Sequence, residues 1–246
     1  MNPQSERLTA SGFIPPWVRH EHRARYDFAA RYVKDKDVVD CACGEGLGSE
    51  TFLKVGARSL AGFDLSEEAV AEARKRCARG AVFGTAGGTA LPLADRCADV
   101  YMALETIEHI AEDRAFFREA ARVLRPGGLF ICSTPNRCIT NPGAPPAAQP
   151  WNRFHVREYS PSDFVDRLAE RFRRIELFGQ NPRPRWKARA MESFGRLFSP
   201  HAAVAAGQLL KTPRFAFDQL EYHAVQTAMA SPEYEYLVAV CREPKP

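Results

Sequence analysis

Residues 38–50 read VVDCACGEGLGSE, a β-branched run that passes through a glycine-rich turn toward a helix. The β-branched run ends at Asp40, and three glycines follow it, namely Gly44, Gly46 and Gly48. Glycines let the backbone approach a ligand closely, and the N-terminus of the next helix offers free N–H groups. The pattern predicts a strand over residues 36–42, a tight turn, and a helix over residues 46–55.

A second apolar run, residues 59–63, leads directly to the carboxylate of Asp64. A carboxylate at the end of a second strand can accept hydrogen bonds from both hydroxyls of a ribose. A dinucleotide site carries the pattern GxGxxG, whereas this turn reads G-E-G-L-G and follows Asp40. Because carboxylates repel a pyrophosphate, the turn favours a ligand with a positive amino group, and S-adenosylmethionine is such a ligand.

Strand-like and helix-like segments alternate beyond this point. Ser66 is a good N-cap for a helix that we expect to reach about Arg79. The next expected elements are strands over residues 81–83 and 98–104, a helix over 113–124 ended by Pro126-Gly127-Gly128, and a strand over 129–133. This alternation predicts an α/β fold, in which a doubly wound, mostly parallel sheet carries helices on both faces.

The regular alternation of strand-like and helix-like segments is interrupted after residue 134. Five prolines between Pro135 and Asn152 predict a long loop, after which we expect a helix over residues 161–171. Strands are predicted over residues 174–178 and 234–241. The long segment between them should contain helices near residues 188–197 and 204–210.

These segments give the expected organisation of the chain as one domain over residues 1–246. Its parts are an N-terminal helical segment (1–35), a substrate-side loop (135–160) and a basic helical insertion (180–232). Residues 180–215 contain seven basic side chains and one acidic side chain, so this stretch carries a charge of +6 in a chain of net charge +4. A positive patch of this kind fits phosphate or another anion, and a solvated basic surface is the competing interpretation. We expect the insertion to cap the substrate cleft or to form a contact in a homodimer.

The composition excludes several classes of protein. The fractions of 45% hydrophobic and 26% charged residues are ordinary for a globular protein and argue against disorder. No apolar run reaches the roughly 18–20 residues that a bilayer-spanning helix needs, and the N-terminus does not resemble a secretory signal. The seven cysteines are scattered and include no CxxC pair, so we expect a reducing, cytoplasmic location.

Several motifs together resemble those of the class I S-adenosylmethionine-dependent methyltransferases, over about residues 26–172. They are VVDCACGEGLG (38–48), FDLS (63–66), ALPLAD (90–95), CADVYMALE (97–105) and LRPGGLFICSTPN (124–136). The resemblance implies a Rossmann-like sheet of seven strands with an insertion between the last two. Its nearest likeness is to the type 11 and ubiquinone-biosynthesis group and to sugar and natural-product O-methyltransferases.

The resemblance also implies which residues hold S-adenosylmethionine. Asp40 and the glycines would hold its methionine part, and Asp64 with Leu65 its ribose. The family usually has an acidic residue before the LP pair, but residues 84–89 read GTAGGT, so backbone groups around Ala86 would take that role. The full expected set is Tyr26, Asp40, Cys41, Ala42, Gly44, Gly46, Asp64, Leu65, Ala86 and Glu105.

An acidic and histidine-bearing run follows the predicted strand over residues 98–104. Glu105, Glu108 and His109 have the spacing i, i+3 and i+4, so on a helix their side chains would share one face. Two carboxylates and an imidazole beside a cofactor can bind a divalent cation. The mixture of oxygen and nitrogen ligands favours Mn²⁺ or Zn²⁺ over Mg²⁺, and Mg²⁺ stays open because availability can override this preference. An acid–histidine pair at this place that packs and caps without a metal is the competing interpretation.

A further histidine, His155, begins the string HVREY. The string and the earlier acidic run together resemble small-RNA 3′-terminal 2′-O-methyltransferases, in which two glutamates and two histidines bind a metal, and ubiquinone-biosynthesis O-methyltransferases. That resemblance implies Glu105, Glu108, His109 and His155 as a metal site. Without a metal, His155 is the better general base, because an imidazole of ordinary pKa near 6.5 accepts a hydroxyl proton at neutral pH.

The sequence therefore predicts an O-methyltransferase that acts on a hydroxyl of a small, polar, sugar-containing substrate. His155, Glu105 and His109 are the expected catalytic residues. Three alternatives stay open: methylation of an RNA 3′-terminal ribose, methylation of an amine or amino sugar, and a binding module without turnover.

Overall fold

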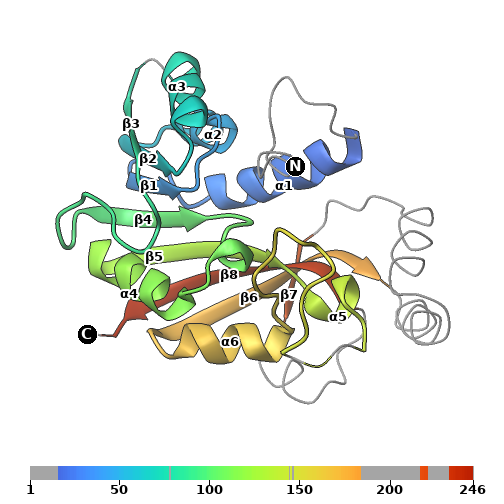
Figure 1. The fold of residues 1–246 in the computed structure, drawn as a ribbon. Helices are drawn as coiled ribbons and strands as arrows, with labels where there is room; N and C mark the ends of the chain where they lie inside the picture. Colours follow the sequence, from blue (N-terminus) through green and yellow to red (C-terminus); the bar gives the residue numbers. More distant parts are fainter. Residues whose placement is uncertain are drawn as a thin grey trace.

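Within the residues that the computed structural model describes (16–77, 79–143, 145, 147–183, 217–220 and 233–245), one eight-stranded sheet lies between two layers of helices (Figure 1). The strands are β1 (Asp37–Cys41), β2 (Ser59–Asp64), β3 (Ala81–Thr85), β4 (Ala98–Ala103), β5 (Leu124–Pro135), β6 (Phe172–Arg183), β7 (Phe217–Leu220) and β8 (Glu233–Pro244). The helices are α1 (Pro16–Ala30), α2 (Leu47–Val55), α3 (Glu67–Arg76), the 3₁₀-helix η2 (Ile107–His109), α4 (Asp113–Val123), α5 (Arg137–Thr140) and α6 (Pro161–Ala169).

The strand order β3-β2-β1-β4-β5-β8-β6-β7 confirms the predicted fold class. The first five strands in this order are parallel, and β8, β6 and β7 add to them in antiparallel pairs. Parallel strands place their carboxyl ends on one edge of the sheet, where ligands of open α/β sheets bind. The predicted seven strands are present, and β7 adds an eighth from within the predicted insertion.

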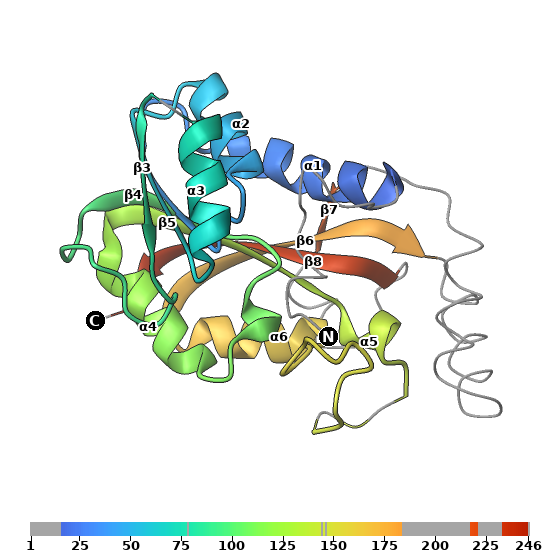
Figure 2. The ribbon, with the colours of Figure 1, turned by 45° about the horizontal axis from the view of Figure 1, so that its top comes forward.

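Consecutive residues of the central strands face opposite helical layers. In β4, Val100 and Met102 pack on the side of α1, α2 and α3, whereas Tyr101 packs on the side of α4 and α6. Figure 2 shows the same two layers from another direction. Because the side-chain period of a strand is two, a sheet that is covered on both faces needs apolar residues at nearly every position. The near-continuous apolar runs of the sequence meet this requirement.

The start of β5 corrects one prediction, because the strand expected over residues 129–133 already begins at Leu124. The helix predicted over residues 113–124 is confirmed as α4, which ends at Val123 with Leu124 as its C-cap, two residues before Pro126. Leu124 pairs with Ala98 and Leu129 pairs with Val100, so the proline–glycine residues between them leave the ladder as a bulge. Gly127 takes a left-handed φ of 81°, a conformation that costs glycine little.

Helix boundaries also differ in two places. Ser66 caps α3 as predicted, and its Oγ accepts the Ala69 N–H at 3.2 Å, but α3 ends at Arg76 and not near Arg79. The predicted long loop contains the short helix α5, which begins where the Asn136 side chain accepts the Cys138 N–H.

The predicted insertion is described only at its ends. The strand predicted over residues 174–178 extends to Arg183 as β6, and β7 pairs with it in antiparallel register. The helices predicted near residues 188–197 and 204–210 lie outside the described residues. Among the described residues, no helix combines the length and the apolar character needed to cross a membrane.

The packing between β6 and β8 generates a stability prediction. A Cβ added at Gly179 would lie 2.1 Å from the ring of Tyr234, so Gly179→Ala forces that ring out of its place in the sheet. We expect the free energy of unfolding to fall by about 1–3 kcal/mol, measured by urea denaturation. Gly87→Ala is the control, because its Cβ would meet only the flexible Leu65 side chain, at 3.4 Å. Equal stability of the two variants would contradict the prediction.

Candidate functional site

The turn between β1 and α2 forms the floor of the site. Ala42, Gly44 and Gly46 all have left-handed backbone conformations, with φ of 60°, 53° and 79°. A Cβ added at Gly44 would meet no described atom within 4 Å, so a ligand can approach the backbone there. At Gly46 the same Cβ would lie 3.1 Å from the backbone of Ala73, so glycine is needed for α3 to pack against the turn.

Asp64, at the end of β2, reaches into this turn. Its Oδ2 accepts the N–H of Gly44 at 3.0 Å, and its Oδ1 accepts the N–H of Ser66 at 2.9 Å. The side chain is largely buried between the two turns. The structure thus places the predicted ribose-binding carboxylate directly beside the glycine turn.

Asp40, the last acid before the turn, is a buried carboxyl close to Asp64. Burial and the neighbouring negative charge raise the pKa of Asp40 to about 7, although Ser49 Oγ donates a hydrogen bond to it at 2.5 Å. A carboxyl with such a pKa is readily ionised by a nearby cation. The predicted contact with a positive amino group would stabilise the ionised form of this carboxyl.

Tyr26 and Arg25 bring the N-terminal helix α1 to the same edge of the sheet. The Tyr26 ring covers the start of α2, where a Cβ added at Gly48 would lie 2.7 Å from it. Arg25 is almost fully buried; its Nη1 donates to Gln180 Oε1 at 2.6 Å, and its guanidinium lies 4.2 Å from the centre of the Tyr236 ring. Among the described residues, Arg25 Nε and Nη2 have no hydrogen-bond partner.

Arg25 is a site residue that sequence reasoning missed. It lies on a helix rich in charged residues, and its burial, which Glu21 of the same helix shares, cannot be read from the sequence. A buried guanidinium with two unfilled donors is well placed to bind an anionic group of a ligand.

The remaining predicted cofactor residues flank Asp64 or line the end of β1. The Ala86 N–H donates to the Asp64 main-chain oxygen at 3.1 Å, and the neighbouring Leu65 is 72% exposed. Burial raises the pKa of the Cys41 thiol to about 12, so this cysteine is a packing residue and not a reactive thiolate.

Glu105 does not share a helix face with Glu108 and His109, which corrects the sequence-based expectation. It has a left-handed φ of 50°, and only η2, a single 3₁₀ turn, follows. Its Oε1 accepts the Ser133 hydroxyl at 2.6 Å, and its Oε2 lies 3.6 Å from Arg25 Nη2. The spacing of the three residues does not account for the turn at Glu105, which sends its carboxylate toward α1.

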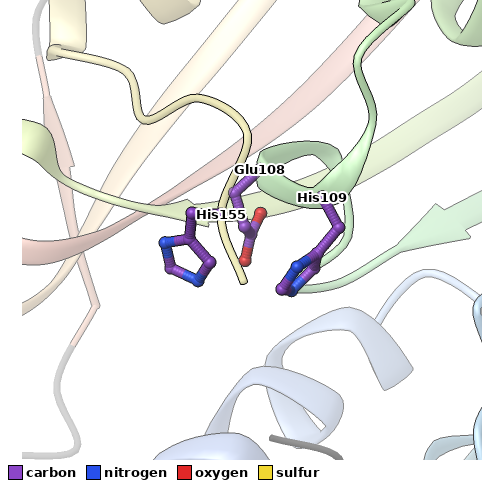
Figure 3. A group of neighbouring side chains, drawn as sticks. All are labelled: Glu108, His109 and His155. Carbon is purple, nitrogen blue, oxygen red and sulfur yellow. The ribbon is translucent and has the colours of Figure 1, made fainter. Parts of the chain in front are cut away.

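Glu108, His109 and His155 do come together, from η2 and from the loop before α6 (Figure 3). One ligand atom from each lies within 4.8 Å of the other two. The loop is attached to η2 through the main-chain oxygen of Glu108, which accepts the N–H groups of Val156 at 2.7 Å and Arg157 at 3.2 Å. Backbone contacts therefore fix the position of His155 relative to the acidic run.

The hydrogen bonds of this group define its chemistry. The carbonyl of Phe154 can only accept, so His109 Nδ1, at 3.0 Å from it, carries the proton and His109 Nε2 keeps its lone pair. Burial and the charge of Glu105 hold the pKa of Glu108 well above its usual range. Glu108 Oε2 is buried with no hydrogen-bond partner among the described residues. The donor set of one carboxylate and two imidazoles can hold a divalent cation.

Comparison with known proteins identifies the family of this chain. A family model described as "Methyltransferase domain" matches residues 39–132. A Mycolicibacterium smegmatis protein described as a "probable S-adenosylmethionine-dependent methyltransferase" is 38% identical over 173 residues, which cover 68% of this chain and 65% of that protein. The chain belongs to the class I S-adenosylmethionine-dependent methyltransferases.

Other relatives of this methyltransferase are more distant. A ubiquinone biosynthesis O-methyltransferase of Parvibaculum lavamentivorans is 33% identical over 129 residues, 50% of this chain and 51% of that protein. A solved S-adenosylmethionine-dependent methyltransferase of Mesorhizobium loti has a TM-score of 0.56 at 20% identity over 90% of this chain and 100% of its own. A "possible histamine N-methyltransferase" of Thermotoga maritima has a TM-score of 0.61 at 15% identity, with 94% and 92% covered.

The similarity to the two solved structures, at 15% and 20% identity, concerns the fold alone. The chain spans 65% of the length of the Mycolicibacterium relative and 51% of the Parvibaculum relative.

The pKa of Asp40 predicts how cofactor binding depends on pH. The cationic amino group of S-adenosylmethionine favours the ionised carboxylate, so below about pH 7 binding must displace a proton and the Kd should rise about tenfold per pH unit. Above that pH the Kd should level off. Calorimetric titrations across this range measure the effect.

The matched control is Asp40→Asn, which keeps the shape of the side chain but has no proton to lose. Its Kd should be higher and should not vary with pH in this way. A Kd of the unchanged chain that is the same at about pH 5.5 and about pH 8 would contradict the assignment.

Proposed function

We propose that this chain is an S-adenosylmethionine-dependent O-methyltransferase that acts on a hydroxyl of a small, polar, sugar-containing substrate. The observation that carries the proposal is the position of two imidazoles beside the cofactor edge of the sheet. His109 and His155 follow β4 and precede α6, and Glu105, at the end of β4, lies 3.6 Å from Arg25 of α1. An imidazole lone pair is suited to accept a hydroxyl proton.

The residues present fit the cofactor. Gly44 leaves open space where a side chain would lie, Asp40 is poised to ionise, and Arg25 has two buried donors unfilled among the described residues. Asp40 and Arg25 would hold the amino and carboxylate groups of the methionine part, and Asp64 the ribose. Leu65 would lie beside Asp64 at the ribose, and backbone groups around Ala86 would lie at the adenine. When bound, S-adenosylmethionine supplies a methyl group on a positively charged sulfur.

The protein's own contribution is to move one proton and to hold two reactants in line. The acceptor hydroxyl would lose its proton to Nε2 of His155, and the electron pair of its oxygen would form the new C–O bond. The bond between the methyl carbon and the positively charged sulfur would break at the same time, and its electron pair would stay on the sulfur of the neutral thioether that leaves. The attachment of the His155 loop to the Glu108 main-chain oxygen fixes the base, so orientation contributes much of the rate. The site otherwise works by excluding water from the reacting atoms.

A hydroxyl acceptor is supported by two features. The ubiquinone relative is named as an O-methyltransferase, and the HVREY string at residues 155–159 resembles that of enzymes of polysaccharide and natural-product sugars. Amine methylation and methylation of an RNA 3′-terminal ribose are tested as alternatives. The basic residues that suit RNA lie mainly outside the described part of the chain.

A metal-assisted form of the same reaction is the second candidate. It is favoured by the ligand atoms of Glu108, His109 and His155, which lie within 4.8 Å of one another, and by the unpartnered Glu108 Oε2. Glu105, the fourth expected ligand, hydrogen bonds instead to Ser133. A Mg²⁺ or Mn²⁺ ion there would supply Lewis-acid activation of the hydroxyl.

An acceptor screen tests the proposed function. The chain and S-adenosylmethionine labelled in the methyl group are incubated with free sugars, glycosides, catechols, amines and a short RNA with a free 3′ end. Label on the oxygen of a sugar or glycoside supports the proposal. Label only on amines, or only on RNA in a reaction that salt suppresses, would replace it with the corresponding alternative.

The role of His155 can be separated from that of a metal. We expect full activity after chelation and removal of metal, verified by elemental analysis, because a histidine base needs no ion. His155→Ala should then lower kcat by about 10²–10⁴-fold, the usual contribution of a general base. Loss of activity on chelation, with recovery on adding Mn²⁺ or Mg²⁺, would favour the metal-assisted form. In that case alanine at Glu108 or His109 should cost as much as alanine at His155.

A further inference from the structure

We infer that Glu158 is a positioning residue that sets which nitrogen of His155 carries the proton. The inference rests on the proposed function, in which His155 Nε2 accepts a proton or a metal. His155 Nδ1 lies 2.7 Å from Glu158 Oε1, and both side chains are buried. A carboxylate can only accept, so this contact places the proton on Nδ1 and leaves the lone pair on Nε2.

A second hydrogen bond requires the same arrangement. Asn152 Nδ2 lies 2.9 Å from His155 Nε2, while Asn152 Oδ1 accepts the main-chain N–H of Phe154 at 3.1 Å. The contact to Phe154 fixes which end of the amide is oxygen, so the end that faces Nε2 is the NH₂ group, which can only donate. Nε2 must therefore be the acceptor, and the Asn152 amide that occupies its lone pair in this structure has to turn aside when a hydroxyl proton or a metal takes that place. The contacts at Nδ1 and at Nε2 of His155 therefore require the same tautomer, with the proton on Nδ1.

Glu158 is itself held in place by Thr140. The Thr140 hydroxyl lies 2.6 Å from Glu158 Oε2 and 3.1 Å from the main-chain oxygen of Asn136, at the start of α5. The chain of contacts runs from α5 through Glu158 to His155. This chain of contacts gives a role to α5 and to Glu158, the acidic residue of the HVREY string. The proposed reaction uses neither of them directly. A partner of this kind orients a histidine and typically changes activity by about 10–100-fold.

The substitutions follow from the hydrogen-bond pattern. Glu158→Gln can keep it, because the amide oxygen can accept from Nδ1 while the amide NH₂ donates to Thr140, whose hydroxyl then donates to Asn136. Glu158→Leu removes both contacts. Thr140→Val keeps the shape of the side chain and removes its hydrogen bonds to Glu158 and to the main-chain oxygen of Asn136, while the Glu158 carboxylate itself stays. Glu170→Gln, at an exposed ion pair with Arg114, is the matched control for loss of a carboxylate.

Nitrogen NMR of histidine-labelled protein gives a direct measurement. At a pH where the ring is neutral, His155 should show a protonated Nδ1 and an unprotonated Nε2, with its signals assigned by their loss in His155→Gln. The Glu158→Gln and Glu170→Gln variants should keep this pattern. The Glu158→Leu variant should shift His155 toward the Nε2–H form, and His109 should not change. An unchanged His155 tautomer in Glu158→Leu would overturn the inference.

Kinetics then test whether Glu158 acts through His155. Glu158→Leu should lower kcat about 10–100-fold with an unchanged KM for S-adenosylmethionine, and Glu158→Gln should lower it less than about tenfold. In the His155→Gln background, Glu158→Leu should cause no further loss. An equal further loss there would overturn the inference. If the chain methylates no acceptor, the proposed function fails, while the NMR measurement still decides the role of Glu158.

Folding is checked by thermal melting of each variant. If Glu158→Leu does not fold, Thr140→Val carries the test, with a smaller loss of kcat and partial Nε2–H character at His155 as the expected result. Wild-type kcat and tautomer in a folded Thr140→Val variant would show that Glu158 needs no support from α5 and would overturn that part of the inference.

Discussion

The Asp64 carboxylate holds two turns together at the edge of the sheet. One oxygen accepts the N–H of Gly44, in the left-handed turn before α2, and the other accepts the N–H of Ser66, where α3 begins. The same charge contributes to the raised pKa of Asp40 across the turn. A single side chain therefore links the turn before α2 to the start of α3 and adds to the effect of burial on the pKa of the neighbouring acid. The cofactor must be accommodated around this contact.

Much of the fold could be predicted because its signals are local. The apolar run before Asp40, the glycines after it and the N-cap at Ser66 each specify a strand end, a turn or a helix start within a few residues. The parallel half of the sheet follows from the alternation of these elements. Because parallel strands end at one edge of the sheet, the same local signals also predict that Asp40, Gly44 and Asp64 lie close together.

What the sequence could not reveal depends on contacts between distant segments. Spacing alone put Glu105 on a helix, but its left-handed backbone and its bond to Ser133, 28 positions away, direct it elsewhere. Arg25 resembles a surface residue until Gln180, 155 positions later, binds it in the interior. The strand β7 has only four residues, and its pairing with β6 defines it better than its composition does. Contacts of this kind, between residues far apart in the sequence, can be seen only in the folded structure.

The two ends of the strand order have a consequence for the protein's behaviour at high concentration. On one side the sheet ends in β3, of five residues, and on the other in β7, of four residues beside the longer β6. The part of β6 beyond β7 carries the exposed side chains of Arg173 and Arg174. Short edges and charged residues leave few unpaired backbone groups for another chain to extend. Short and charged edge strands of this kind oppose edge-to-edge aggregation, the hazard of any open sheet.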